Sequence, residues 1–347
     1  MVAGIELGKK YAQVCVKTDS MKDAESVTKV AGTEHYRLPV EADLEDKNEL
    51  QELFRKLWKM LMPYGNKDSL QQLVFCLEDN SAQMRELLFE IVQIYNISTE
   101  KVSFLDKPES FCAYVMHQSA ELLSHNALLI ENHEGEKKKF LLHKRSKTTP
   151  QVLEVREVSE KSLDSIFTDH AISSVFLVGD DFEEEWMQKN LKLLKTGRRV
   201  FAGKNLYVKG ACYRGLELEE DQQDYLYLGE EKVCVNIGLK SEENGKPAYV
   251  FIVDGGRNWY ESHASVEVLL LDEPVLEFAI IPVNGKEMKT AAIHLNELPK
   301  RPAKTTRLRI DLEFMSPSYA KLMIKDLGFG ELFPQSDMVY EGELQWD

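Results

Sequence analysis

Two short stretches of the sequence carry side chains that could do chemistry. His133 and His143 stand ten residues apart with Glu131 and Glu134 nearby, and imidazole and carboxylate groups are common zinc ligands. The three acids of 183–185 could supply the paired carboxylates of a glycosidase. A polar hairpin explains the first stretch, and acids favoured at the start of a helix explain the second. We therefore expect no metal site and no catalytic carboxylate pair.

A glycine-rich turn at 254–257 could let the backbone approach a phosphate group. It lies between two segments of alternating hydrophobicity, which favours a plain β-hairpin. A Walker-type loop is absent, because Gly203-Lys204 is followed by Asn205 and Arg198 stands where the upstream glycine belongs. The GxSxG motif of serine hydrolases and the CxxC spacing of metal sites are absent too. These local motifs predict no catalytic residue.

The net charge of the chain limits the classes of partner that it can bind. The 347 residues include 43 lysines and arginines and 58 acids, a net charge of −15 that repels phosphate backbones. The basic clusters at 137–139 and 198–199 are short, so we expect no nucleic-acid partner. No apolar run approaches the roughly 18 residues that a membrane helix needs. We expect no membrane association.

The five cysteines are scattered singly among apolar residues, which fits reduced and buried thiols. The first residues, Met1 to Gly4, lead directly into a strand pattern and do not resemble a signal peptide. Both observations predict a cytoplasmic protein.

The hydrophobic pattern divides the chain at about residue 220. Residues 1–220 alternate between strand and helix patterns, whereas 221–347 show only alternating, strand-like segments. In the first part we expect strands on both sides of a turn at Gly8-Lys9 and at 73–77, 102–105, 127–131, 139–143 and 175–179, with helices at 48–62, 84–94, from Pro108, after 180–181 and at 204–215. In the second part we expect strands at 232–237, 248–253, 264–271, 275–282, 290–295, 308–314 and 319–325.

Six segments follow one another in the order of a known family. Residues 4–14, GIELGKKYAQV, resemble the first phosphate loop of the actin-like ATPases in their DnaK-type heat-shock chaperone form. The segments that follow are similar to that family's strand and helix at 73–80, connecting segment at 102–114, second phosphate hairpin at 127–143, adenosine loop at 174–186 and last helix at 203–215. Residues 298–325 resemble its substrate-binding β-sandwich.

The resemblance implies a fold, a ligand and a partner. It implies an α/β domain of the actin-like ATPase type at 1–220, built from two reduced ribonuclease-H-like halves, and an all-β sandwich at 221–347. It also implies ATP with magnesium between the halves and a protein or peptide bound by the sandwich. The implied nucleotide-binding residues are Glu6, Gly8, Lys9, Lys10, Glu131, Gly135, Gly179, Asp180 and Asp181.

The phosphate loops depart from the family pattern. Glu6 replaces an aspartate, and Lys9 and Lys10 replace hydroxyl residues. The second loop, 130–137, keeps one glycine and places acids where phosphates would lie, which costs about 1 kcal/mol per like-charge pair at 4 Å in water. Asp180 replaces a glycine beside the nucleotide. These departures predict a degenerate site with no cofactor.

Two hypotheses of different classes follow. The first is a non-catalytic, chaperone-like interaction scaffold, a pseudo-ATPase that docks a partner through its β domain. The alternative is a divergent ATP-binding chaperone or ATPase in which Lys9 or Lys10 replaces the lost donors. A small-molecule kinase on the same fold is a third class, for which the sequence offers no candidate general base.

Overall fold

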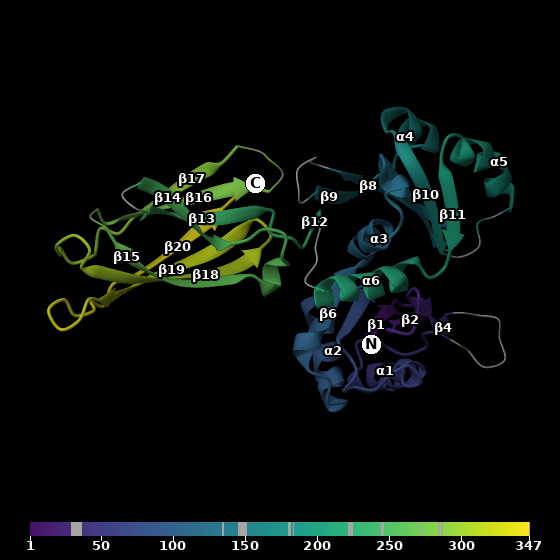
Figure 1. Cartoon of the computed structure of the whole chain (residues 1–347), viewed down its shortest axis with the longest axis horizontal. Coiled ribbons are helices and arrows are strands. Elements are labelled where there is room, and N and C mark those ends of the chain that lie inside the picture. Colours follow the sequence, from purple (N-terminus) through teal and green to yellow (C-terminus); the bar gives the residue numbers. More distant parts are fainter. Residues whose placement is uncertain are drawn as a thin grey trace. The chain divides into compact units, whose positions relative to one another are not determined.

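The computed structural model describes residues 1–28, 37–133, 135–144, 151–179, 182, 184–220, 225–243, 246–271, 273–283, 285 and 287–346. The chain forms two compact units (Figure 1). The first consists of Met1–Lys144 and Leu153–Tyr225, and the second of Arg145–Val152 and Leu226–Asp347. Strand β12 (Tyr225–Leu228) spans the boundary. No helix among these residues is long and apolar enough to cross a bilayer.

The first sheet of the first unit is built on the predicted hairpin at the N-terminus. Strands β1 (Val2–Leu7) and β2 (Tyr11–Lys17) are antiparallel, and β5 (Gln72–Leu77) and β6 (Val102–Asp106) continue the sheet in parallel with β1. The strand order is β3-β2-β1-β5-β6, with β3 (Glu25–Ser26) at one edge, and β4 (Leu38–Pro39) also pairs with β2.

The second sheet repeats this order. The hairpin of β7 (Asn126–His133) and β8 (Glu136–Lys144) is followed by β9 (Gln151–Glu157) on its outer side. On the other side of β7 lie β10 (Ile172–Gly179) and β11 (Arg199–Gly203), both parallel to β7. Each sheet thus has a hairpin, an outer antiparallel strand and two parallel strands beside the first strand. This repeated topology agrees with the two halves that the resemblance implies.

Helices separate and cover the two sheets. Helices α1 (Lys47–Leu61) and α2 (Ala82–Ile94) pack on the first sheet in one apolar cluster, and α4 (Leu163–Asp169) and α5 (Glu184–Lys195) pack on the second. Helices α3 (Lys107–Met116) and α6 (Leu206–Glu220) lie between the sheets (Figure 1). The ring of Phe111 in α3 contacts Phe176 in β10, with 5.7 Å between ring centres.

Glycines allow α6 to approach both neighbours closely. A Cβ on Gly4 in β1 would lie 2.6 Å from Val208 O of α6, and a Cβ on Gly210 of α6 would lie 2.0 Å from Ser110 O of α3. No side chain fits at such distances, so these two glycines bring the helix pair and the first sheet into direct backbone contact. The position of α3 relative to β1 is fixed by this packing.

The second unit is a sandwich of two four-stranded sheets. One sheet has the order β14-β13-β16-β17, with β13 (Val235–Glu243), β14 (Lys246–Val253), β16 (Val275–Pro282) and β17 (Lys289–His294). The other has the order β15-β18-β19-β20, with β15 (His263–Leu270), β18 (Thr306–Ser316), β19 (Tyr319–Gly328) and β20 (Val339–Gln345). Alternate residues of both sheets, such as Ile237 and Ile310, meet in one core.

The expected α/β part followed by an all-β part is confirmed, with local differences. The turn at 254–257 joins β14 to β15, which belong to different sheets, so the expected hairpin is wrong. The backbone amides of Gly255 and Gly256 already donate to Asn236 Oδ1 and Val233 O, which leaves them unavailable to a phosphate. Ile94, expected on the buried stripe of α2, is 51% exposed.

Candidate functional site

The turn between β1 and β2 is held by a side chain from a third strand. Gly8 N–H donates to Tyr11 O at 3.0 Å and closes the turn. Lys9 N–H donates to Glu78 Oε2 at 2.8 Å, and Glu78 directly follows β5. A Cβ on Gly8 would lie 2.9 Å from the same carboxylate oxygen, so the glycine makes room for Glu78.

The Glu78 carboxylate therefore occupies the position of an anion at this turn. A phosphate at the turn would need the same amide and would be repelled by the negative charge beside it. The side chains of Lys9 and Lys10 are exposed.

Glu6, the next implied residue, is more buried than the turn. It is partly buried near the end of β1, and Gln13 Nε2 donates to its Oε2 at 3.2 Å and to Lys204 O at 2.6 Å. Burial raises the pKa of the Glu6 carboxyl to about 7, although Lys107 and Arg37 oppose this rise. Near neutral pH this group is therefore partly protonated, which weakens it as a metal ligand.

Glu131, in β7 of the second sheet, forms an ion pair with Lys107 at the start of α3. The distance between Lys107 Nζ and Glu131 Oε1 is 2.8 Å, and the side chains are 23% and 12% exposed. Burial lowers the pKa of Lys107, but the carboxylates of Glu131, Glu78 and Glu6 outweigh it and leave the pKa above its usual value. We call Glu6, Glu78, Lys107 and Glu131 the strand-end cluster, because all four flank strand ends.

The glycines of the other two implied loops have different roles. Gly135 lies at the tip of the β7–β8 hairpin with a φ of +87°, and a Cβ there would meet nothing within 4 Å. Gly179, at the end of β10, has a φ of +113°, and a Cβ would lie 2.1 Å from Asn132 O. Gly135 serves the turn, and Gly179 serves the close approach of β10 to β7. Asp180 and Asp181 lie outside the described residues.

A small cavity of about 220 Å³ opens beside the first turn. Its polar lining consists of one lysine, Lys9, and four acids, Asp43, Glu45, Glu78 and Asp79. A triphosphate would face net negative charge here, and the ammonium of Lys107 lies beside the carboxylate that could hold its magnesium ion. These residues do not fit a magnesium nucleotide.

Of the histidine pair, His143 can be placed, whereas the side chain of His133 and residue Glu134 lie outside the described part of the chain. His143 Nε2 lies 3.2 Å from Glu154 Oε2 of the neighbouring strand β9. Within the part of the chain that the structure describes, no group of three or more metal-ligating side chains could hold a metal ion. His143 therefore acts as a cross-strand partner of Glu154.

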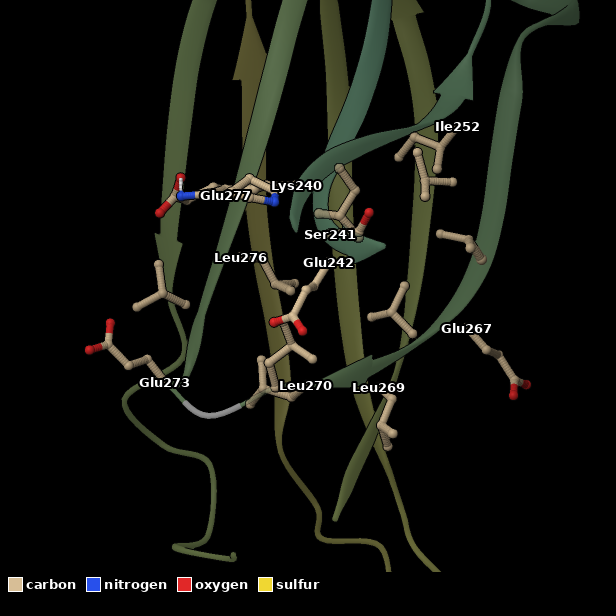
Figure 2. Close-up of a pocket in the computed structure, with 17 residues that line it drawn as sticks. Lys240, Ser241, Glu242, Ile252, Glu267, Leu269, Leu270, Glu273, Leu276 and Glu277 are labelled. Atoms are coloured by element: carbon tan, nitrogen blue, oxygen red, sulfur yellow. Dashed lines mark hydrogen bonds and ion pairs between the residues drawn. The ribbon is translucent and has the colours of Figure 1, made fainter. Parts of the chain in front are cut away.

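A larger groove of about 630 Å³ lies in the second unit, where the edge strands of the two sheets face each other (Figure 2). Apolar side chains line most of it, namely Leu239, Val250, Ile252, Val266, Val268, Leu269, Leu270, Leu271, Val275 and Leu276. Val266, Val268 and Leu270 share the inward face of β15, as its alternation predicts. Inward-facing residues of these edge strands are half-buried, which shows that the sandwich core is uncovered at the groove.

The rim of the groove is acidic. Its charged residues are four glutamates and one lysine, and Lys240 pairs with Glu277 at 2.6 Å (Figure 2). Among the residues that the structure describes, no lysine or arginine forms an ion pair with Glu242 or Glu273. An apolar groove with unpaired acids favours an apolar ligand that carries positive charge.

Sequence reasoning found Glu6 and Glu131 but missed Glu78 and Lys107. Both missed residues directly follow a parallel strand, β5 and β6, and the carboxyl ends of neighbouring parallel strands meet at one edge of a sheet. That rule was the available signal, because the strands at 73–77 and 102–105 were predicted correctly. The partners across the site depend on the packing of α3 and could not be read from the sequence.

Two family models match the chain. The C-terminal model of a family of unknown function (DUF5716) matches residues 27–230, and a domain of unknown function (DUF8552) matches residues 232–346. No curated protein matches the sequence.

Several solved structures are similar to about two thirds of the chain. Inorganic polyphosphate/ATP-glucomannokinase from Arthrobacter sp. strain KM is 9% identical, with a TM-score of 0.37 over 64% of this chain and 99% of that one. A putative N-acetylglucosamine kinase from Porphyromonas gingivalis is 8% identical, with a TM-score of 0.37 over 63% and 100%. The activator of 2-hydroxyisocaproyl-CoA dehydratase from Clostridium difficile, with bound ADPNP, is 8% identical, with a TM-score of 0.33 over 63% and 96%. At these TM-scores the similarity carries no functional argument.

Proposed function

The chain belongs to the family of unknown function DUF5716, and we propose that it is a non-catalytic, chaperone-like interaction scaffold. In this proposal the first unit is an actin-like frame that does not turn over nucleotide, and the second unit binds a partner protein. The observation that carries the proposal is the hydrogen bond from Lys9 N–H to Glu78 Oε2, at 2.8 Å. An internal carboxylate there takes the donor that a phosphate would need.

The charges around the turn support the same conclusion. Phosphoryl transfer depends on positioned cations and donors around the phosphates. Here the cavity beside Lys9 is lined by four acids, and Lys107 is engaged by Glu131. The frame keeps its two repeated sheets, while the Lys9 amide and the Lys107 ammonium are engaged by carboxylates of the chain itself.

The groove of the second unit is the proposed docking site. It exposes Val250 by 52% and Leu269 by 42%, and it lies between β14 and β15, each of which is an edge strand of its sheet. An extended peptide segment can fill such a groove with alternate apolar side chains while it hydrogen-bonds to an edge. The acidic rim favours a segment flanked by lysine or arginine.

The nucleotide part of the proposal is tested by a thermal melt with and without magnesium and ATP in millimolar excess. A ligand at about 100 times its dissociation constant would stabilise the fold by about 2.7 kcal/mol. We expect no change in the melting temperature and no release of phosphate. A rise in melting temperature that Glu131→Gln abolishes would instead support the alternative, a divergent nucleotide-binding protein.

The docking part is tested by fluorescence anisotropy with a labelled peptide of alternating leucines between flanking lysines. We expect saturable binding that weakens about tenfold or more in Val250→Lys, which places a charge of the same sign as the peptide in the groove. Val339→Lys is the matched control, because Val339 is 46% exposed and lies outside the groove. Equal binding by both variants would contradict the assignment of the groove.

A further inference from the structure

A polar cavity of about 650 Å³ lies at the second sheet of the first unit. It is bordered by the residues that precede the parallel strands β7, β10 and β11, so it lies at their amino ends. The strand-end cluster lies elsewhere, because Glu131 is near the carboxyl end of β7. We call this cavity the arginine pocket after its charged and titratable lining, which is Arg198, Arg199, His125, His170 and Glu121. In a chain with a net charge of −15, this lining has more basic groups than acidic ones.

Arg198 is a cation that is held in place without a counter-charge. Its Cζ lies 3.8 Å from the centre of the Phe167 ring, and its Nη1 donates to Leu193 O of α5 at 2.7 Å. The ring covers the flat face of the guanidinium and the carbonyl uses one N–H group, so other in-plane donors remain. Among the residues that the structure describes, no carboxylate pairs with Arg198, and partial burial lowers the pKa of its guanidinium. A half-buried cation in this setting is stabilised when an anion enters the cavity.

Arg199 supplies a second guanidinium at the same cavity. Its Nη2 donates to Glu121 Oε2, and the two side chains are 60% and 71% exposed. Because an exposed ion pair contributes little free energy, an anion can compete with Glu121 for this guanidinium. The ring nitrogens of His125 and His170 are further potential donors on the lining.

We propose that the arginine pocket binds the phosphate group of a small molecule, either a phosphate monoester or free inorganic phosphate. A monoester carries about two negative charges near neutral pH, which suits a site with two arginines. Phosphate oxygens also accept the paired N–H groups of a guanidinium. The volume of the cavity lies in the range of small-molecule sites, about 300–1,000 Å³. The inference goes beyond the proposed function, because it concerns neither the groove nor the strand-end cluster.

The test is isothermal titration calorimetry of the whole chain with glycerol 2-phosphate, in a low-salt buffer without other phosphates. We expect saturable binding that weakens about tenfold or more in Arg198→Gln, because a charged hydrogen-bond donor is lost. Glycerol, which lacks the phosphate group, should not bind. Inorganic phosphate is titrated in parallel. Tighter binding of glycerol 2-phosphate identifies a monoester as the ligand, and equal or tighter binding of inorganic phosphate identifies the free anion.

Glu121→Gln provides a result that a purely structural role of the arginines would not produce. The variant keeps the size of the side chain, removes the negative charge from the lining and releases Arg199. We therefore expect it to bind glycerol 2-phosphate about threefold more tightly than the unmodified chain.

Arg156→Gln is the matched control for the loss of one positive charge. Arg156 Nε lies 2.9 Å from Glu154 Oε1 on β9, and Arg156 is not part of the pocket lining. Its substitution should leave binding unchanged. Equal weakening in Arg156→Gln and Arg198→Gln would mean that only the net charge matters, which would contradict the proposed site.

Two other results would overturn the inference. One is the absence of saturable binding of either anion by the unmodified chain, and the other is binding that Arg198→Gln and Arg199→Gln leave unchanged. If Arg198→Gln does not fold, the exposed Arg199 decides, and we expect Arg199→Gln to weaken binding about threefold. Because nucleotide and groove peptide are absent, these results do not affect the tests of the proposed function.

Discussion

The strand-end cluster of the first unit and the groove of the second unit differ in whether their side chains have partners within the chain. At the cluster, Lys9 N–H donates to Glu78 and Lys107 pairs with Glu131, so these two donors are already engaged within the chain. In the groove, Val250 is 52% exposed and Glu242 has no ion-pair partner among the described residues. A site that satisfies itself has little to offer a ligand, whereas uncovered apolar surface gains free energy when a partner covers it.

The largest effect on stability is expected where helices α3 and α6 pack most closely beside the strand-end cluster. Gly210→Ala would place a Cβ 2.0 Å from Ser110 O and force α3 and α6 apart. We expect a loss of about 3 kcal/mol in the free energy of unfolding, measured by urea denaturation. Gly203→Ala is a suitable control, because a Cβ there would have its nearest contact at 3.7 Å. Equal stability of the two variants would show that the helix pair does not hold the cluster.

The next effect is a pH dependence from Glu6. Burial raises its pKa to about 7, whereas an exposed glutamate titrates near 4.5, so the folded chain binds more protons than the unfolded chain between these values. The stabilising contribution is present in full below pH 4.5 and is lost as the pH rises toward 7. Over this range we expect the unmodified chain to lose about 2 kcal/mol or more relative to Glu6→Gln. Chemical denaturation at pH 5 and pH 8 measures the difference.

Glu6→Gln keeps an oxygen that accepts from Gln13 Nε2, so the variant isolates the charge. A constant gap between the two proteins at both pH values would mean that Glu6 is ionised throughout. In that case the strand-end cluster would carry one more negative charge than we infer. It would then resemble the acidic groove more closely.

A smaller effect is expected when the internal anion is removed. Glu78→Ala deletes the acceptor of Lys9 N–H, and because this turn is exposed, water takes its place. We expect a loss of about 1 kcal/mol in the free energy of unfolding. We also expect no gain of ATP binding by calorimetry, because Asp43, Glu45 and Asp79 remain in the cavity. ATP binding by this variant would identify Glu78 as the sole barrier.

The smallest effect on stability is expected in the groove. Val250→Ala removes an exposed apolar side chain and should change the free energy of unfolding by about 0.5 kcal/mol or less. Its binding of the lysine-flanked peptide should nevertheless weaken in the anisotropy assay. A large loss of stability without a loss of binding would mean that Val250 belongs to the core and not to a docking surface.

Much of the local structure could be predicted from hydrophobic periodicity. The helix at 48–62 is α1, and the run at 73–77 is the buried centre of β5, because both segments repeat apolar residues at a clear period. Strands β9 and β11 and helix α4 were missed. Strand β11 is mostly exposed at an edge and α4 has only seven residues, so neither has a distinct apolar period.

The candidate site was predicted only in part. Some of its features depend on the local sequence, and others depend on the tertiary structure. Periodicity, turn glycines and charge predicted the order of the elements and the acidic surface, because these depend on neighbours along the chain. Glu6 and Glu131 were indicated by the resemblance to the chaperone phosphate loops. Three contacts required the folded chain: Glu78 with the Lys9 amide, Lys107 with Glu131, and the meeting of β14 and β15 edges at the groove. Each joins segments more than ten residues apart, and their approach is set by packing, such as that of Gly210 against Ser110, which no local pattern encodes.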